Sequence, residues 1–180
     1  MNIEKELTIL EIERKEIEDK LNKMGAIKKG DYLQKRLVYD FNPKQSNKWI
    51  RLRTNGEVTT LTIKEVIDNK KIDGTKELEI EVSDFDKTNL ILNELGYNYR
   101  NYQENLRTIY LIDNVEISID TWPLIPTYME IEGKSNEDVL EVLNKINPNK
   151  DKITTLDVES IYKTIYGIDI MKIKELKLNN

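Results

Sequence analysis

The sequence predicts an α+β fold in which a closed eight-stranded antiparallel β-barrel carries flanking helices. Two observations lead to this prediction. Charged and aliphatic residues alternate in several segments, as expected where successive side chains of a strand point to opposite faces. Between them lie stretches with apolar residues at helical spacing and a glycine at the end. Because eight strands close a barrel and the helices need the aliphatic face of the sheet, the charged face is expected to point inward.

The strands are expected where this alternation is clearest. Ile50-Arg51-Leu52-Arg53 places two arginines on one face, and Glu77-Leu78-Glu79-Ile80-Glu81-Val82 places three carboxylates opposite three aliphatic side chains. The eight predicted strands, in chain order, are Leu7–Lys15, Tyr32–Asp40, Lys48–Thr54, Val58–Glu65, Lys76–Ser83, Tyr102–Ile112, Val115–Thr121 and Tyr128–Gly133.

Four helices are expected between and after the strands. Lys15–Met24 has apolar residues at i, i+4 and i+7 and is followed by Gly25. A side chain that accepts hydrogen bonds at a helix start predicts the other three: Ser83 or Asp84 opens a helix through Leu95, Ser135 opens one to about Ile146, and Asp157 opens one through about Tyr166. Residues 1–170 are therefore expected to form a single domain, and residues 171–180 a tail.

Composition excludes several classes of site and partner. The 180 residues contain no cysteine and no histidine, which excludes thiolate and imidazole chemistry, so that any metal must be held by oxygen. Such ligands favour Mg²⁺, Mn²⁺ or Ca²⁺ over zinc or copper. The net charge of −5 argues against a nucleic-acid partner. Without an apolar run of membrane-spanning length or a signal peptide, the protein is expected to be cytoplasmic, with no membrane partner.

The charged stripes have two possible explanations. A half-solvated sheet would place charged residues outward and is the common case. However, a solvated face usually mixes signs so that neighbours pair, whereas here whole strands carry one sign. Burying so many ionised groups away from water would cost much free energy. The favoured interpretation is therefore a hydrated tunnel in which acids hold cations and bases hold an anion.

The order of these residues resembles the CYTH superfamily. The resemblance rests on Glu11-x-Glu13-x-Lys15, Arg51-x-Arg53, Lys64, Arg107, Asp120 and Glu130-x-Glu132 and runs from about Ile3 to Tyr166. The family includes class IV adenylyl cyclases, thiamine triphosphatases and inorganic triphosphatases. The stretch GYNYRNYQENLRTIY (residues 96–110) is most similar to bacterial class IV adenylyl cyclase-like members.

The resemblance implies a triphosphate tunnel with Mg²⁺ or Mn²⁺ and assigns its residues. Lys15 and Glu13 are the candidate catalytic residues. The candidate triphosphate ligands are Lys15, Arg51, Arg53, Lys64, Arg107 and Arg36, and the candidate metal ligands are Glu11, Glu13, Asp120, Glu130 and Glu132. Further candidate tunnel acids are Glu79, Glu81 and Glu116, whereas Glu77 is less expected there.

Three features of the chain are less usual for that family. Relatives often carry Lys-x-Arg where this chain has Asn105-Leu106-Arg107, and an acid at the position of Arg36, which either joins the anion site or lies on the surface. Residues Trp122–Pro126 replace a glycine-containing loop and are expected to cap the barrel end or to stack an aromatic ring of the substrate.

Three functions remain possible for such a tunnel. A metal-dependent triphosphatase is preferred, a class IV adenylyl cyclase is the close alternative, and a non-catalytic module that binds triphosphate or polyphosphate is the third. The expected partner is a small molecule that contains a triphosphate. A homodimer is also expected, because the outward aliphatic surface is larger than the available helices can cover.

Overall fold

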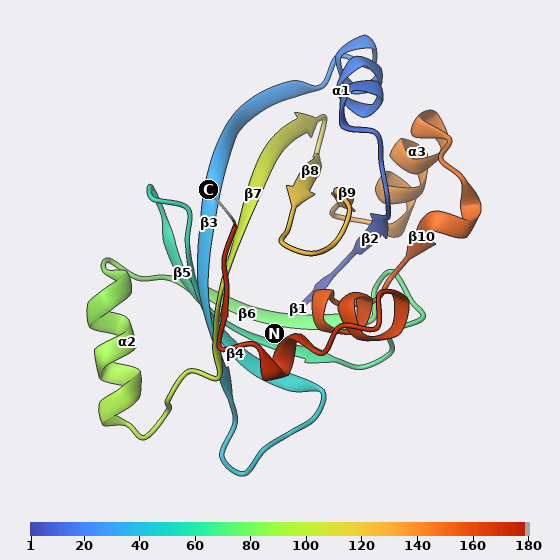
Figure 1. Ribbon diagram of the computed structural model, residues 1–180. Helices are drawn as coiled ribbons and strands as arrows, with labels where there is room; N and C mark the ends of the chain where they lie inside the picture. The colour runs from blue at the N-terminus through green and yellow to red at the C-terminus, as the bar shows by residue number, and fades with distance from the viewer. Residues whose placement is uncertain (179–180) are drawn as a thin grey trace.

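The computed structural model describes residues 1–178 as an α+β structure built on one strongly curved sheet (Figure 1). Within these residues the strands follow the order β1-β6-β5-β4-β3-β7-β8-β9-β2-β10, with β11 off this path. All pairs are antiparallel except β11 with β7. The strands are β1 (Asn2–Glu4), β2 (Glu6–Ile9), β3 (Ile27–Asp40), β4 (Lys48–Thr54), β5 (Thr59–Val66), β6 (Thr75–Glu81), β7 (Asn101–Ile112), β8 (Val115–Thr121), β9 (Tyr128–Glu132), β10 (Ile153–Thr154) and β11 (Glu175–Leu176).

The helices lie where capping residues and apolar spacing predict them. Asp84 and Ser135 accept hydrogen bonds from backbone N–H groups in the first turns of α2 and α3, and Asp157 does so for α4. The helical segments are α1 (Arg14–Lys23), α2 (Phe85–Glu94), α3 (Asn136–Ile146), η1 (Lys150–Lys152), α4 (Val158–Ser160), the π-helical η2 (Ile161–Ile165) and η3 (Ile170–Lys172).

The α+β class is confirmed, but the prediction of a closed eight-stranded barrel is wrong. The sheet is an open half-barrel, because the N-terminal segment does not continue as one strand past Lys5. Its first part, β1, pairs with β6, and its second part, β2, pairs with β9. Beyond β2, β10 adds a further strand, so the ladder of hydrogen bonds does not return to its start. The curvature still leaves one face concave.

Seven of the predicted strands are confirmed as β3 to β9, with β3 beginning earlier, at Ile27. The prediction of a strand over Leu7–Lys15 is wrong, because β2 ends at Ile9 and α1 begins at Arg14. The charged residues after Ile12 favour a helix, and burial of Ile17 and Leu21, four residues apart, places one face of that helix against the core.

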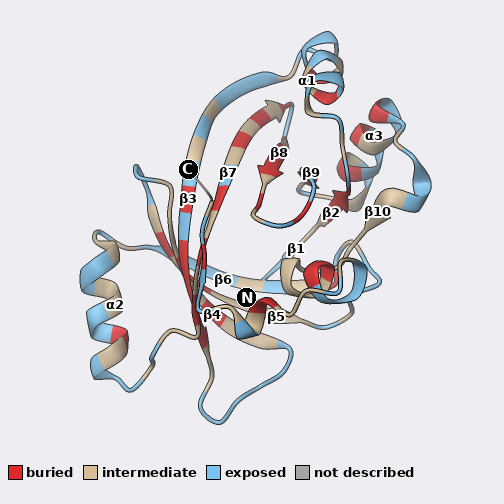
Figure 2. Ribbon diagram, viewed as in Figure 1, coloured by how far each residue is buried: buried red, intermediate tan, exposed pale blue. Residues whose placement is uncertain are grey.

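Apolar residues pack on both sides of the sheet. On the convex side, α1 and α3 cover β2, β7, β8 and β9 over a cluster that includes Leu21, Ile117 and Ile131, and α2 covers Leu37 and Leu52. A third cluster, around Trp122, Tyr128 and the C-terminal helical segments, fills one end of the half-barrel. Figure 2 shows these buried stretches in red, and the polar pocket lies beside the third cluster.

The end of the chain and the outer surface bear on two further predictions. Within residues 171–178, predicted to be a tail, β11 pairs with β7; residues 179–180 of that predicted tail lie outside the described residues. Outward aliphatic residues such as Leu78 and Ile80 are half exposed, and the homodimer stays a prediction. Among residues 1–178, no helix is long and apolar enough to cross a membrane.

Candidate functional site

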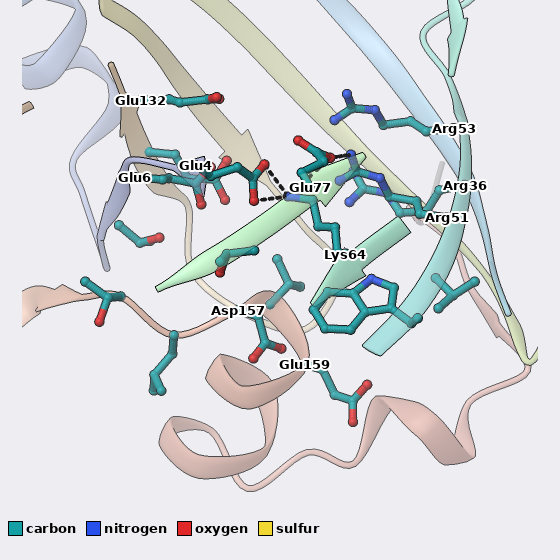
Figure 3. Close-up of a pocket in the computed structure, with 18 of the residues that line it drawn as sticks. Glu4, Glu6, Arg36, Arg51, Arg53, Lys64, Glu77, Glu132, Asp157 and Glu159 are labelled. Carbon is teal, nitrogen blue, oxygen red and sulfur yellow. Dashed lines mark hydrogen bonds and ion pairs between the residues drawn. The ribbon is translucent and has the colours of Figure 1, made fainter. Parts of the chain in front are cut away.

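The concave face of the sheet holds a pocket of about 330 Å³ lined mainly by charged side chains. Residues from β1 to β9 reach it because alternation along each strand turns one charged stripe inward. In Figure 3 the three arginines Arg36, Arg51 and Arg53 lie on one side, and Glu6 and Glu132 lie on the other. Arginines thus gather on one side of the pocket and carboxylates on the other, with ion pairs between them.

The basic side comes from four neighbouring strands. Arg51 and Arg53 lie on β4, and Lys64 lies on β5. Arg36 on β3 is directly opposite Arg53, and Arg107 lies on β7. All five residues line the pocket, including Arg36, whose place the sequence left open.

Three of these bases are paired with carboxylates that lie two strands away in the sheet. Arg51 Nη2 lies 3.0 Å from Glu77 Oε1, and Arg53 Nη2 lies 3.7 Å from Glu79 Oε2. Lys64 Nζ lies 2.8 Å from Glu4 Oε1. A bound anion would compete with these carboxylates for the bases.

Arg107 belongs to a tighter network. Its Nη2 donates to Asp120 Oδ2 at 2.7 Å and to Glu130 Oε2 at 2.5 Å. Burial raises the pKa of Asp120, although Arg107 partly offsets this effect. Asp120 also accepts from Asn105 and Ser118, is fully buried and does not line the pocket. The structure therefore places Asp120 behind Arg107 rather than among groups that face the pocket.

The acidic side brings carboxylates from three strands together. Glu132 on β9 lies opposite Glu6 on β2 and opposite Glu116 on β8. Burial, followed by the charge of Glu130, raises the pKa of Glu6 well above its ordinary value. Withdrawal from water and the charge of Glu4 raise the pKa of Glu132. These acids repel one another, and a cation among them would relieve the repulsion.

Two carboxyl groups between the two sides have opposite pKa shifts. Burial would raise the pKa of Glu4, but Lys64 and a hydrogen bond with Glu77 lower it overall. Burial and the same hydrogen bond raise the pKa of Glu77 to about 7. Glu77 thus interacts with Glu4 on one side and with Arg51 and Lys64 on the other.

The structure does not bring Glu11, Glu13 and Lys15 to the pocket, which corrects their predicted placement. Glu11 has a positive φ of 54° and pairs with Lys152. Glu13 is the exposed N-cap residue of α1. The Lys15 side chain is 82% exposed and lies 2.9 Å from Asp19, one helical turn further on. These three residues lie at the start of an outer helix, because the strand ends before them.

The pocket contains a second Glu-x-Glu pair, which the sequence interpretation missed. Glu4, Glu6 and Thr8 all line the pocket, and Thr8 lies opposite Glu130. The alternation of Ile3, Leu7 and Ile9 with polar residues was the available signal. In this segment, threonine stands where the Glu-x-Glu-x-Lys pattern has lysine.

The structure brings some of the remaining candidate acids to the pocket and leaves one outside it. Glu79 and Glu116 line the pocket, and so does Glu77, which was less expected there. Glu81 is exposed and lies outside the pocket lining. Trp122 is buried in the cluster that fills one end of the half-barrel.

A second hollow of about 410 Å³ adjoins the pocket. The two share Trp49, Arg100, Asp157 and Glu159, none of which was singled out as a site residue from the sequence. Asp157 and Glu159 come from α4 and the residue before it, which lie below the pocket in Figure 3.

The carboxylate side fits a hard cation in ligand type but not in preformed geometry. Its donors are all oxygens, which suit Mg²⁺ or Mn²⁺. Among residues 1–178, however, no three acidic side chains are gathered closely enough to hold an ion by themselves. Oxygens of a bound substrate would have to complete such a site.

Known proteins share the fold of this chain. The CYTH domain family model matches residues 10–162. The PH1012 protein of Pyrococcus horikoshii superposes with a TM-score of 0.74 at 21% identity, over 86% of this chain and 96% of the other. A candidate adenylate cyclase from Vibrio parahaemolyticus gives a TM-score of 0.75 at 13% identity, over 93% and 99% of the two chains.

A plant protein adds a third comparison. A candidate adenylyl cyclase from Hippeastrum, whose structure is described as revealing a dominant triphosphatase activity, gives a TM-score of 0.60 at 14% identity, over 96% of this chain and 99% of the other. At these identities the similarity shows the fold alone. A search of curated proteins finds no match to the chain.

Proposed function

Because the chain belongs to the CYTH domain family, we propose that its pocket binds a triphosphate-containing small molecule and hydrolyses it with the help of a divalent metal ion. The observation that carries the proposal is a pocket in which Arg36, Arg51 and Arg53 lie on one side and Glu6 and Glu132 on the other, with ion pairs between them. Phosphoryl transfer depends mainly on positioning and on neutralising charge. The two surfaces together offer charges of both signs for these tasks.

The basic side is proposed to hold the phosphate chain. Arg51 and Arg53 present guanidinium groups that match phosphate oxygens, and Lys64 adds a point charge. Their ion pairs with Glu77, Glu79 and Glu4 span 2.8–3.7 Å. A triphosphate would replace these carboxylates as the partner of each base. Asp120 holds Arg107 in place through two hydrogen bonds. The remaining N–H donors of Arg107 are proposed to bond to the phosphate chain.

The acidic side is proposed to hold Mg²⁺ or Mn²⁺. Glu116, Glu130 and Glu132 would be its protein ligands, since all three line the pocket. When bound, the ion supplies positive charge to the phosphoryl oxygens. The elevated pKa of Glu132 supports this assignment, because it arises partly from neighbouring carboxylates that repel it.

Glu6 is the proposed acceptor of the proton from the attacking water. Its pKa is raised well above the ordinary value by burial and by Glu130, so its ionised form is a stronger base than an exposed carboxylate. Lys15, the earlier candidate, is exposed on α1 outside the pocket lining, and the chain has no histidine to take its place.

Thr8 favours a second candidate, a non-catalytic module that binds triphosphate. The lysine of the Glu-x-Glu-x-Lys pattern is a candidate for orienting water, and a buried threonine replaces it here. Under this alternative the basic side keeps its role, while turnover is absent.

One experiment separates the candidates. The protein is incubated with Mg²⁺ or Mn²⁺ and, separately, with ATP, tripolyphosphate or thiamine triphosphate, and the products are identified. Release of orthophosphate without cyclic AMP supports hydrolysis, and its loss in EDTA supports the metal requirement. Cyclic AMP together with pyrophosphate would instead identify a cyclase. Tight binding of tripolyphosphate without turnover would identify the binding module.

A further inference from the structure

We propose that Arg36 forms a metal-independent subsite for one phosphoryl group and supplies from β3 the positive charge that β7 lacks at Asn105. The inference rests on the proposed function, since it assumes that the pocket takes a triphosphate. It goes further by assigning a specific anchor to the phosphate chain, and by separating that anchor from the metal ion.

Arg36 differs from the other bases in its partners. Arg51, Arg53, Lys64 and Arg107 each have a carboxylate oxygen within 3.0, 3.7, 2.8 and 2.5 Å, respectively. Among residues 1–178, Arg36 forms no ion pair, and its side-chain hydrogen bond goes to the uncharged Oδ1 of Asn105. Its Nε is buried without a hydrogen-bond partner. A buried guanidinium is normally paired, so the missing partner points to a ligand.

The surroundings of Arg36 are positive. It is only 6% exposed, and Arg53 stands directly opposite it on β4. Burial, followed by the charges of Arg51, Arg53 and Arg107, lowers the pKa of Arg36 to about 9. The group therefore remains charged near neutral pH, and an anion placed between these arginines would relieve their repulsion.

The guanidinium is also held in place by two neighbouring side chains, Trp122 and Asn105. Its carbon lies 4.4 Å from the centre of the Trp122 ring, within the range of a cation–π contact. Asn105 accepts from Arg36 through Oδ1 and donates to Asp120 through Nδ2 at 2.5 Å. Asn105 thus bridges Arg36 and Asp120, and this acid is already paired with Arg107. An anion from outside the protein is the partner that this arrangement leaves available.

The position of Asn105 explains why the base lies on β3. A lysine at residue 105 would place its charge on the inner face of β7, next to Arg107. Here the side chain is a neutral amide, and the Arg36 guanidinium bonds to that amide from the neighbouring strand. The positive charge thus lies on β3, the strand next to β7.

The test measures binding of tripolyphosphate by calorimetry in EDTA, so that metal ligands play no part. Wild type is expected to bind, and Arg36→Met is expected to bind at least about tenfold more weakly, as the loss of a charge-assisted contact implies. The double variant Arg36→Met/Asn105→Lys should regain most of the affinity, because it returns the charge to β7. Lys35→Met is the matched control, since Lys35 is exposed on the other face of the same strand.

A second variant protects the test against misfolding. Gln103 lies opposite Arg36 on β7, so Gln103→Glu should give the guanidinium an internal carboxylate partner and also weaken binding at least about tenfold. Full affinity in a folded Arg36→Met or Gln103→Glu protein would overturn the subsite. Binding by wild type that requires Mg²⁺ would overturn metal independence while leaving the proposed function intact. No binding of any triphosphate with or without metal would instead reject the proposed function.

Discussion

Two stretches near the N-terminus carry the same Glu-x-Glu spacing, but they lie in different parts of the molecule. Glu4 and Glu6 line the pocket on the concave face, whereas Glu11 and Glu13 are exposed beside α1. The third member of each pattern also differs, since Thr8 is buried opposite Glu130 and Lys15 is 82% exposed.

The residues that follow each pair account for the difference. Glu4 and Glu6 alternate with Ile3, Leu7 and Ile9, and the last two are buried against the helices on the convex side. Apolar residues two apart fix a strand. After Glu13, by contrast, the buried apolar residues are Ile17 and Leu21, four apart, which is the spacing of a helix. The period of the apolar partners, more than the charged pattern, decides which pair of acids enters the pocket.

The largest expected effect is on catalysis. Glu6→Gln should lower kcat for metal-dependent hydrolysis by at least about a hundredfold, because general base catalysis contributes factors of this order. Glu13→Gln is the matched control and should retain the rate of wild type, since Glu13 lies outside the pocket lining. Rates of orthophosphate release at saturating tripolyphosphate and Mg²⁺ provide the measurement. A large loss in Glu13→Gln with none in Glu6→Gln would reverse the comparison.

The second effect is on substrate binding. Arg51→Ala should weaken tripolyphosphate binding by about 1.5–3 kcal/mol, the range for a charge-assisted hydrogen bond. Lys15→Ala removes an equal charge from the outer helix and should leave the affinity unchanged. Calorimetric titrations of the two variants and wild type test this. Equal losses in both would mean that general electrostatic attraction, rather than contact in the pocket, governs binding.

The fold and much of the pocket could be predicted from the sequence because their signals are local. Alternation along β4 placed Arg51 and Arg53 on one face, and Ser135 identified the start of α3. The open edge of the sheet could not be predicted, because it depends on the break at Lys5 between two strands that pair with distant partners. The contact of Arg36 with Trp122 likewise depends on how β3 and the segment after β8 meet in space.

The third expected effect is on stability and arises from the carboxylates that lie close together on the acidic side. Burial and neighbouring carboxylates raise the pKa of Glu6 and of Glu132, and the pKa of Glu77 is about 7. A raised pKa means that the folded protein holds the proton more tightly than the unfolded chain. The free energy of unfolding therefore falls as pH rises from the ordinary value of 4.5 through about 7. The metal-free protein is expected to melt at a lower temperature near about pH 8 than near about pH 5.5.

Glu132→Gln sharpens this test. It removes one carboxylate from the acidic side and should raise the Tm of the metal-free protein at about pH 8 by about 1–3 °C, a small shift because Glu132 remains partly open to water. With Mg²⁺ and tripolyphosphate present, wild type should gain more stability than the variant, because ligand binding favours the folded state. Melting curves under both conditions measure this. A lower Tm in the metal-free variant would identify Glu132 as a structural partner.

The smallest effect is expected at Glu11, in the stretch that lies outside the pocket. Its carboxylate pairs with Lys152, and the two side chains are 35% and 38% exposed. Lys152 lowers the pKa of Glu11 by a hydrogen bond, yet an ion pair open to water typically contributes about 0–1 kcal/mol because solvent and salt screen it. Glu11→Gln keeps the backbone and the size of the side chain, so Tm should change by no more than about 2 °C.

Affinity for tripolyphosphate and kcat should match wild type, because the positive φ of 54° and the helix that follows keep this segment away from the concave face. A tenfold loss of either quantity would show that the segment moves into the pocket when substrate binds, and the distinction between the two Glu-x-Glu pairs would then hold only for the free protein.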